Sequence, residues 1–164
     1  MGEFKKQVGD SVVRGDFSRL DALVKGLSKN LYVDIGVLSG EGRASAGEGD
    51  ITIAGIGAVH EFGSLDKKIP QRSFIAMPLQ AKSQEIENNV GKKIESLIAE
   101  DNIEGIYELI GIYGEAVIQE AFETGGFGSW AELKESTIER KGSSAILIDT
   151  GRLRQAITSK VGGK

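Results

Sequence analysis

The feature that most constrains this chain is a series of apolar residues at helical spacing, which extends from Leu79 almost to Gly125. Its apolar positions are Leu79, Ile86, Val90, Ile94, Leu97, Ile103, Ile106, Tyr107, Ile110, Tyr113, Val117, Ala121 and Phe122. Pro78 suits the first turn of one helix, and Asp101 can cap a second helix that ends at Gly125. Because the break between them is short, the spacing predicts two long antiparallel helices side by side.

Shorter elements are expected in front of this pair. Residues 1–15 are expected to form an extended or helical arm. A helix over 17–27 has Asp16 as its candidate cap and Asn30 as its stop. Residues 31–37 alternate between apolar and polar side chains, which predicts a strand.

Another short helix is expected between Ile53 and Phe62, because apolar side chains recur there at every third position. Gly63 is suited to end it. Its interior glycines, Gly55 and Gly57, each lower helix stability by about 1 kcal/mol relative to alanine. They are expected where another part of the backbone approaches closely.

The C-terminal part is expected to hold two short helices and a strand. Ser136 or Thr137 can cap the first helix, and Asp149 or Thr150 can cap the second. The chain then continues into a predicted terminal strand over 156–161. No linker is long enough to separate domains, so residues 1–164 are expected to form one domain.

The absence of cysteine and the single histidine exclude much enzyme chemistry. Disulfides, thiol nucleophiles, cysteine-based zinc sites and multi-histidine metal sites within one chain cannot form. No cofactor is expected. No window approaches the ~20 apolar residues that span a bilayer, so no membrane association is expected.

Charge is distributed unevenly along the chain. Residues 84–123 contain ten acidic and two basic residues, a balance of −8, whereas residues 134–164 contain seven basic and three acidic residues, a balance of +4. These stretches are either solvated faces or complementary surfaces that dock copies of the chain or a partner. The net charge of −4 does not indicate general affinity for nucleic acid.

Two flexible loops are expected, at residues 39–50 and 63–72. The first holds four glycines but lacks the lysine followed by serine or threonine that completes a phosphate-binding P-loop. The second is basic and contains Pro70. Candidate interface positions in these loops are Gly40, Glu41, Arg43, Asp66, Lys67 and Lys68.

The only histidine, His60, stands beside Glu61. Ser64 occupies the position of the second histidine in an H-E-x-x-H zinc motif, so that motif is not formed. A structural histidine is one interpretation of His60. A general base that acts with Glu61 or Asp149 is the other.

Two further features have a structural and a chemical interpretation. Asp149-Thr150-Gly151 is first a turn and cap signal, although the same three residues occur in aspartic proteases. The lone tryptophan, Trp130, is expected in the core or in an interface, where its N–H group needs one partner.

Several segments together resemble a known family. The chain contains His60-Glu61-Phe62-Gly63, then IPQRSF over 69–74, then Trp130, TIERKGS over 137–143 and LIDTGRL over 147–153. In that order, they resemble the neck or tail-completion proteins of long-tailed bacteriophages, the tail-component and virion-morphogenesis group. The residues that carry this resemblance are His60, Glu61, Phe62, Gly63, Pro70, Arg72, Phe74, Trp130, Asp149, Thr150, Gly151, Arg152 and Leu153.

The resemblance implies a fold and a function. The implied fold is α+β, with a small antiparallel sheet packed against two long helices and short helices near both ends. The implied protein is a non-enzymatic virion component, assembled in the host cytoplasm. It forms a ring of six subunits that joins the connector and head-closure proteins to the tail and lets DNA pass through its lumen without sequence-specific binding. The alternatives are a tail terminator ring and, from another class, a small His/carboxylate hydrolase.

The motif residues also have expected physical roles. Gly63 lets the short helix stop, and Phe74 anchors the next helix in the core. A buried Arg72 requires a carboxylate, and Glu61 is the first candidate. The Asp149 side chain is expected to bind backbone N–H groups of its turn. Phe62 and Gly63 are expected to matter more for folding than His60 does for chemistry.

Overall fold

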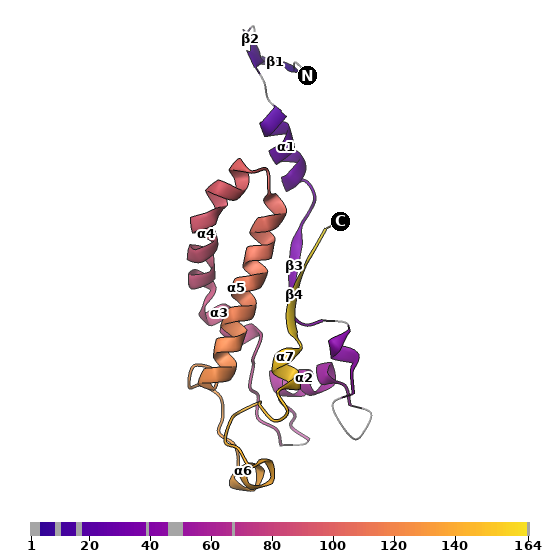
Figure 1. Ribbon diagram of the computed structural model, residues 1–164, viewed down its shortest axis with the longest axis vertical. Coiled ribbons are helices and arrows are strands. Elements are labelled where there is room, and N and C mark those ends of the chain that lie inside the picture. Colours follow the sequence, from indigo (N-terminus) through magenta and orange to yellow (C-terminus); the bar gives the residue numbers. More distant parts are fainter. Residues whose placement is uncertain are drawn as a thin grey trace.

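The computed structural model describes residues 4–8, 11–15, 18–38, 40–45, 51–66 and 68–163. Helices and antiparallel strands are combined in an α+β arrangement, as expected (Figure 1). The candidate cap Asp16 and the loop residue Lys67 lie outside the described residues. So do Ser39 and residues 46–50 of the glycine-rich loop.

The helical pair is present, with one additional break. Helix α3 (Ala76–Ala81) contains Pro78, and α4 (Ser83–Ala99) follows after Lys82, so the first predicted helix is two helices. Helix α5 (Ile103–Thr124) runs back beside α4 (Figure 1). Its cap is Asn102, whose side chain accepts a hydrogen bond from Gly105 N at 2.9 Å, and not Asp101 as predicted.

Strands β3 (Tyr32–Val37) and β4 (Ile157–Gly162) form an antiparallel sheet that brings the two halves of the chain together. Their register pairs Val37 with Ile157 and Tyr32 with Gly162. Helix α5 packs on this sheet through glycines: a Cβ atom at Gly114 would lie 2.6 Å from Ile35 Cδ1. The glycines therefore allow the helix and the sheet to approach closely.

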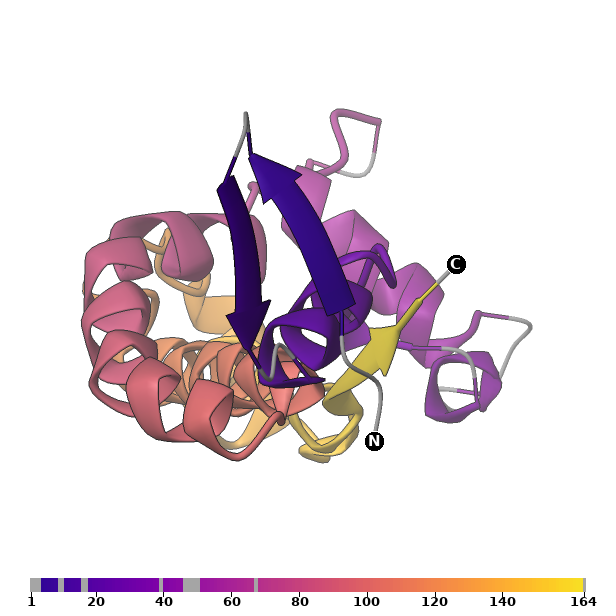
Figure 2. The same ribbon diagram turned by 90° about the horizontal axis from the view of Figure 1, so that it is seen from above.

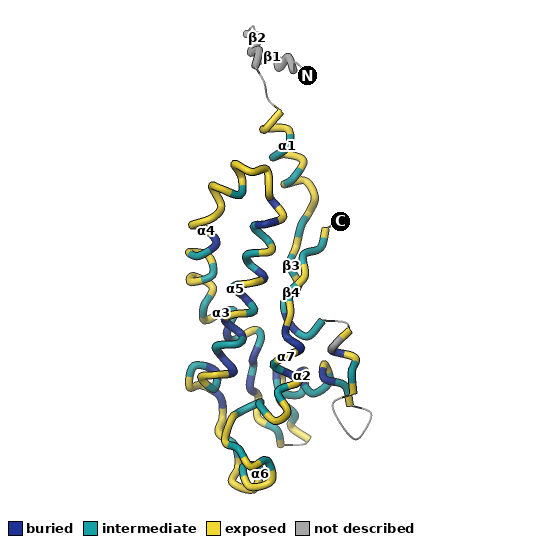
Figure 3. The backbone as a smooth tube through the Cα atoms, viewed as in Figure 1, coloured by how far each residue is buried: buried dark blue, intermediate teal, exposed yellow. Residues whose placement is uncertain are grey.

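The N-terminal elements extend away from this body. Strands β1 (Phe4–Val8) and β2 (Ser11–Gly15) pair with each other in an antiparallel hairpin, and α1 (Ser18–Leu27) leads from them to β3 (Figures 1 and 2). The described residues before α1, 4–8 and 11–15, are therefore extended rather than helical. Helix α1 has no buried residue, and most of its length is exposed (Figure 3).

The C-terminal part has the expected elements but different caps. Helix α6 (Glu135–Lys141) begins after Lys134, so neither Ser136 nor Thr137 caps it. Helix α7 (Arg152–Gln155) begins after Gly151, without a side-chain hydrogen bond at its cap, so the capping predicted for Asp149 and Thr150 is wrong. Gly151 can take the observed φ of 76° at low cost because it has no Cβ.

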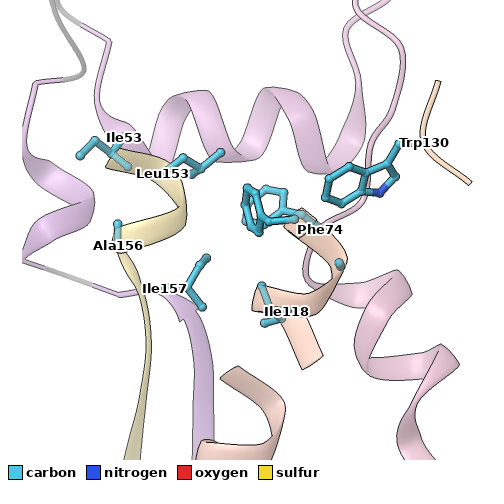
Figure 4. Packing of buried hydrophobic residues seen from close by; sticks show 9 residues of the cluster. Ile53, Phe74, Ile118, Trp130, Leu153, Ala156 and Ile157 are labelled. Carbon is cyan, nitrogen blue, oxygen red and sulfur yellow. The ribbon is translucent and has the colours of Figure 1, made fainter. Parts of the chain in front are cut away.

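The core lies where α2 (Ile53–Phe62), α5, α7 and β4 meet (Figure 4). Its aromatic centre is Phe74, whose ring centroid is 5.5 Å from that of Phe122, and Trp130 meets Phe122 edge-on at 5.8 Å. Gly57 lets α2 approach this centre, since a Cβ there would be 3.3 Å from Leu153 Cδ1. The neighbours of Gly57 are thus the side chains of Leu153 and Phe74, and not another part of the backbone as predicted.

Phe62 does not join the core, contrary to its predicted place in the apolar face of α2. Its side chain is 77% exposed. Steps of three residues advance about 300° around a helix, so the direction drifts by about 60° at each step. Over the three steps from Ile53, Phe62 reaches the opposite face. The buried positions of α2 are instead Ile53, Gly57 and Glu61, at steps of four.

Candidate functional site

Glu61 joins the HEFG segment to the IPQRSF segment through a buried carboxylate. Its two oxygens accept hydrogen bonds from the backbone N–H groups of Phe74, Ile75 and Ala76 at 2.8–3.1 Å, and from the Ser73 hydroxyl at 2.7 Å. These N–H groups lie at the start of α3 and have no carbonyl partner within the helix. The carboxylate therefore caps α3 and also interacts favourably with the positive end of its dipole.

Arg72 does not pair with Glu61, so that expectation is wrong. The arginine is buried, and its guanidinium donates to the carbonyl oxygens of Ala131 and Glu132 at 2.8 and 2.9 Å. Burial lowers its pKa. Two carbonyl dipoles thus replace the expected carboxylate, and they attach the segment after Trp130 to the IPQRSF segment.

Trp130 is buried in the core, as expected, and its indole N–H donates to the Ser73 carbonyl at 3.0 Å. The Ser73 hydroxyl also accepts a hydrogen bond from Met77 N at 2.9 Å. Ser73 therefore connects Glu61, α3 and Trp130. The HEFG and IPQRSF motifs and the tryptophan form one hydrogen-bonded corner.

Gly63 is required by backbone geometry at this corner. Its φ of 75° and ψ of 175° lie in a region that only glycine adopts readily, and an added Cβ would be 3.0 Å from Gln71 N. We expect Gly63→Ala to lower the free energy of unfolding by about 1–3 kcal/mol in urea titrations. The control is Gly91→Ala in α4, where an added Cβ meets nothing within 4 Å. It should be neutral or slightly stabilising, and equal effects at both sites would contradict the argument.

An open pocket of about 500 Å³ lies next to this corner, between α2, α6 and α7. One part of its lining is apolar and comes from Ile53, Ile56, Leu133, Leu147 and Leu153. The polar part contains His60, Arg72, Arg140, Lys141 and Arg152, with Thr137 and Thr150, and Asp149 is the only carboxylate among the described lining residues. The pocket therefore combines an apolar wall with an excess of positive charge.

The pocket brings together residues from every motif segment except Trp130 itself. His60 comes from α2, Arg72 from the IPQRSF segment, Arg140 from α6, and Asp149 and Arg152 from LIDTGRL. Phe62 is not among the lining residues, and Phe74 and Trp130 lie behind them in the core. Arg140 and Lys141 carry much of the pocket's charge although sequence reasoning gave them no role. The sequence signal that could have identified these two residues was their position just before the glycine turn at Gly142.

His60 is half-buried in this pocket, and its Nδ1 atom is buried without a hydrogen-bond partner among the described residues. Burial lowers the pKa of His60, and the positive charges of Arg72 and Lys141 lower it further. Burial likewise lowers the pKa of Lys141, an effect that Asp149 opposes and Arg72 increases. The cations on the pocket wall therefore favour a neutral imidazole.

This environment predicts a pH dependence of stability. The pKa of His60 in the folded state is below the ordinary value of 6.5, so the unfolded state binds the proton first as pH falls. The contribution of neutral His60 to the free energy of unfolding is therefore fully present above about pH 6.5, and it is lost as the pH falls toward the folded-state pKa. His60→Gln should flatten the dependence of the unfolding free energy between about pH 7 and 5. Superimposable wild-type and variant profiles would show that His60 is not the titrating group.

The two carboxylates proposed to assist His60 differ in position. Both Glu61 oxygens are already occupied by Ser73 and the start of α3, so Glu61 is a structural cap. Asp149 is exposed and lines the same pocket as His60. However, no carboxylate orients the imidazole through Nδ1 in the described residues. The described part of the chain also contains no group of three or more histidine, aspartate and glutamate residues that could hold a metal ion.

The candidate interface loops lie on the surface. Gly40, Arg43, Asp66 and Lys68 are exposed. Residues 41–43, which include Glu41, form a 3₁₀ turn. The second loop is closed by Ser64 and Ile69, which exchange backbone hydrogen bonds of 2.9 Å in both directions. Its tip presents Leu65, which is 97% exposed.

Comparison with protein-family models, with curated proteins and with solved structures finds no match for this chain. Within the described ranges, no helix combines the length and apolar character needed to cross a bilayer. The arguments about function therefore rest on the geometry of the corner and the pocket.

Proposed function

We propose that this chain is a structural virion protein of the phage head–tail junction, which assembles as a ring joining the connector to the tail. The observation that carries the proposal is the convergence of the family-like motifs. HEFG, IPQRSF and the segment at Trp130 interlock through Glu61, Ser73 and Arg72, and LIDTGRL lines the pocket beside them. The motif residues therefore act together, which supports the resemblance as more than a set of short coincidences.

The exposed apolar side chains fit a protein that functions in an assembly. Leu20, Val24 and Leu27 recur along one side of α1, on the arm that extends from the body (Figure 3). Phe62, the last residue of α2, and Leu65, three residues later, are also exposed, and α2 lies far from the arm (Figure 1). Large exposed apolar side chains that gather on protruding elements are typical of protein–protein contacts. In the proposed ring, the arm and the 63–72 loop contact neighbouring subunits or the adjoining connector and tail proteins.

The negative charge of α4 and α5 would affect how DNA passes through such a ring. Exposed carboxylates are distributed along α4 and α5, and they include Glu87, Glu95, Glu104 and Glu108. If these helices line the lumen, their charge repels phosphate and lets the genome pass without sticking. A channel lined by lysine and arginine would refute this arrangement.

Two other functions remain as alternatives to the joining role. A tail terminator ring would use the same subunit contacts but would cap the tail tube. A His/carboxylate hydrolase would use His60 with Asp149, which is the one described carboxylate that shares its pocket. The occupied Glu61 and the unpartnered Nδ1 of His60 argue against the hydrolase in this conformation.

The proposal is tested by locating the protein on intact particles. An affinity tag at the C-terminus, followed by gold labelling and electron microscopy, should place label between head and tail. The matched control is the same tag on a protein of the tail tip. Label at the tail tip, on the capsid shell or absent from purified particles would contradict the proposal.

A further inference from the structure

We propose that the basic pocket receives the acidic end of the α4–α5 hairpin from a second copy of this chain. This end consists of residues 94–104. The inference deepens the proposed function and rests on it, because it names the contact that joins neighbouring subunits in the ring. Such a contact needs a pocket whose positive charge is not neutralised and a segment that is both acidic and apolar. The pocket and the segment must also lie too far apart to meet within one chain.

The pocket carries positive charge that the described residues of its own chain do not neutralise. Arg72, Arg140, Lys141 and Arg152 form no ion pair with any described residue. Arg72 is held by two carbonyl oxygens and Lys141 by the carbonyl of Ala145, whereas Arg140 and Arg152 are exposed at the pocket. A ligand that brings a carboxylate would offset charge that Asp149 alone cannot balance. The apolar wall favours a ligand that also carries aliphatic side chains.

Residues 94–104 have that combination. They contain four acidic residues and no basic one, and Glu95, Glu100, Asp101 and Glu104 are all exposed. Ile94 and Ile98 lie on the same end of α4 and are both more than a third exposed. Arg19 donates a hydrogen bond to the Ala99 carbonyl at 3.0 Å and not to a carboxylate. None of the four carboxylates forms an ion pair with a described residue.

The arrangement of the molecule makes the contact intermolecular. The turn between α4 and α5 lies toward one end of the long axis, whereas α2, α6 and α7, which form the pocket, lie toward the other end (Figure 1). A chain therefore cannot fill its own pocket with this segment. One surface of each copy meets a different surface of the next, which is the heterologous contact from which closed rings are built.

Two charge-reversed full-length variants test the contact by sedimentation velocity at low ionic strength. The pocket variant is Arg140→Glu/Arg152→Glu, and the hairpin variant is Glu95→Lys/Glu100→Lys. The control, Lys29→Glu/Lys160→Glu, makes the same charge change as the pocket variant at exposed positions outside α1, the pocket and residues 94–104. Circular dichroism establishes that each variant is folded. The wild-type chain and the control should self-associate in a salt-dependent manner, and each test variant should lose at least ~100-fold in affinity for itself.

Mixing the two variants gives the decisive result. Each retains one intact half of the contact, and the two reversed halves are again opposite in charge, so an equimolar mixture should regain the association that each variant alone has lost. Wild-type protein that remains monomeric, variants that associate normally, or a mixture that does not pair would overturn this inference. Loss of binding to a short DNA duplex in the pocket variant, with self-association unchanged, would also overturn it and identify phosphate as the ligand. None of these results changes the position of the protein on particles, so the proposed function is tested separately.

Discussion

Replacing Glu61 with alanine should lower the free energy of unfolding by roughly 3–5 kcal/mol. The substitution removes the acceptor of three backbone N–H groups and the Ser73 hydroxyl. Each buried donor left without a partner costs about 1–3 kcal/mol. Glu61→Gln keeps one acceptor oxygen and should lose less than half as much. Urea unfolding followed by circular dichroism measures both effects.

The control for Glu61 is Glu108→Ala, which removes an exposed carboxylate from α5. Substitutions at such surface positions usually change the free energy of unfolding by no more than about 0.5 kcal/mol. If Glu61→Ala were as mild as Glu108→Ala, the carboxylate would not be the cap of α3. The account of the HEFG and IPQRSF motifs as one corner would then fail.

The second large effect is expected from Phe74→Ala, with a loss of about 3–5 kcal/mol in the free energy of unfolding. Phe74 is only 1% exposed and contacts the rings of the aromatic cluster. Truncation leaves a cavity beneath Gly57 and beside Phe122. Unfolding monitored by Trp130 fluorescence and by circular dichroism should give the same midpoint for the variant.

Phe62→Ala is the matched control, since it makes the same chemical change on an exposed side chain. It should alter the stability of the isolated chain by no more than about 0.5 kcal/mol. Its effect should appear instead in association with neighbouring subunits or proteins. Equal destabilisation by the two substitutions would mean that Phe62 is covered in solution.

The long helices and strands β3 and β4 were predictable from the sequence because their patterns are local, whereas the pairing of β1 with β2 was not predicted. The α5 pattern spans six turns, and the alternation in β3 is uninterrupted. The break at Lys82 was not visible, because the apolar pattern continues from α3 into α4. The pairing of β3 with β4 joins segments more than a hundred residues apart, and hydrophobic periodicity carries no information about such partners.

The candidate site was predicted in its parts but not in its connections. From the sequence, Glu61 and Arg72 were expected to form an ion pair with each other. In the structure, each side chain instead forms hydrogen bonds with backbone groups. One signal was available for Glu61: it follows Ile53 and Gly57 at steps of four, on the buried face of α2. A glutamate on such a face needs several donors, and a helix start provides them. The partners of Arg72, at Ala131 and Glu132, depend on tertiary structure alone.

The structure also changes the interpretation of the charge pattern. The basic C-terminal segment does not simply form a solvated face, because Arg140, Lys141 and Arg152 gather with His60 and Arg72 in one pocket. The acidic segment at residues 84–123 extends along α4 and α5, and Glu123 at its end forms an ion pair with Arg154 of the basic segment. The turn between α4 and α5 lies away from the pocket (Figure 1), and this separation of its carboxylates from the pocket cations favours association of copies over binding of nucleic acid.

If this protein joins phage heads to tails, as we propose, particles assembled without it should lack that joint. Electron microscopy of particles assembled without the chain should show DNA-filled heads and separate tails of normal length. Addition of the purified chain should then restore joined particles. Overlong tails would identify a terminator instead, and complete, joined particles in its absence would contradict the account.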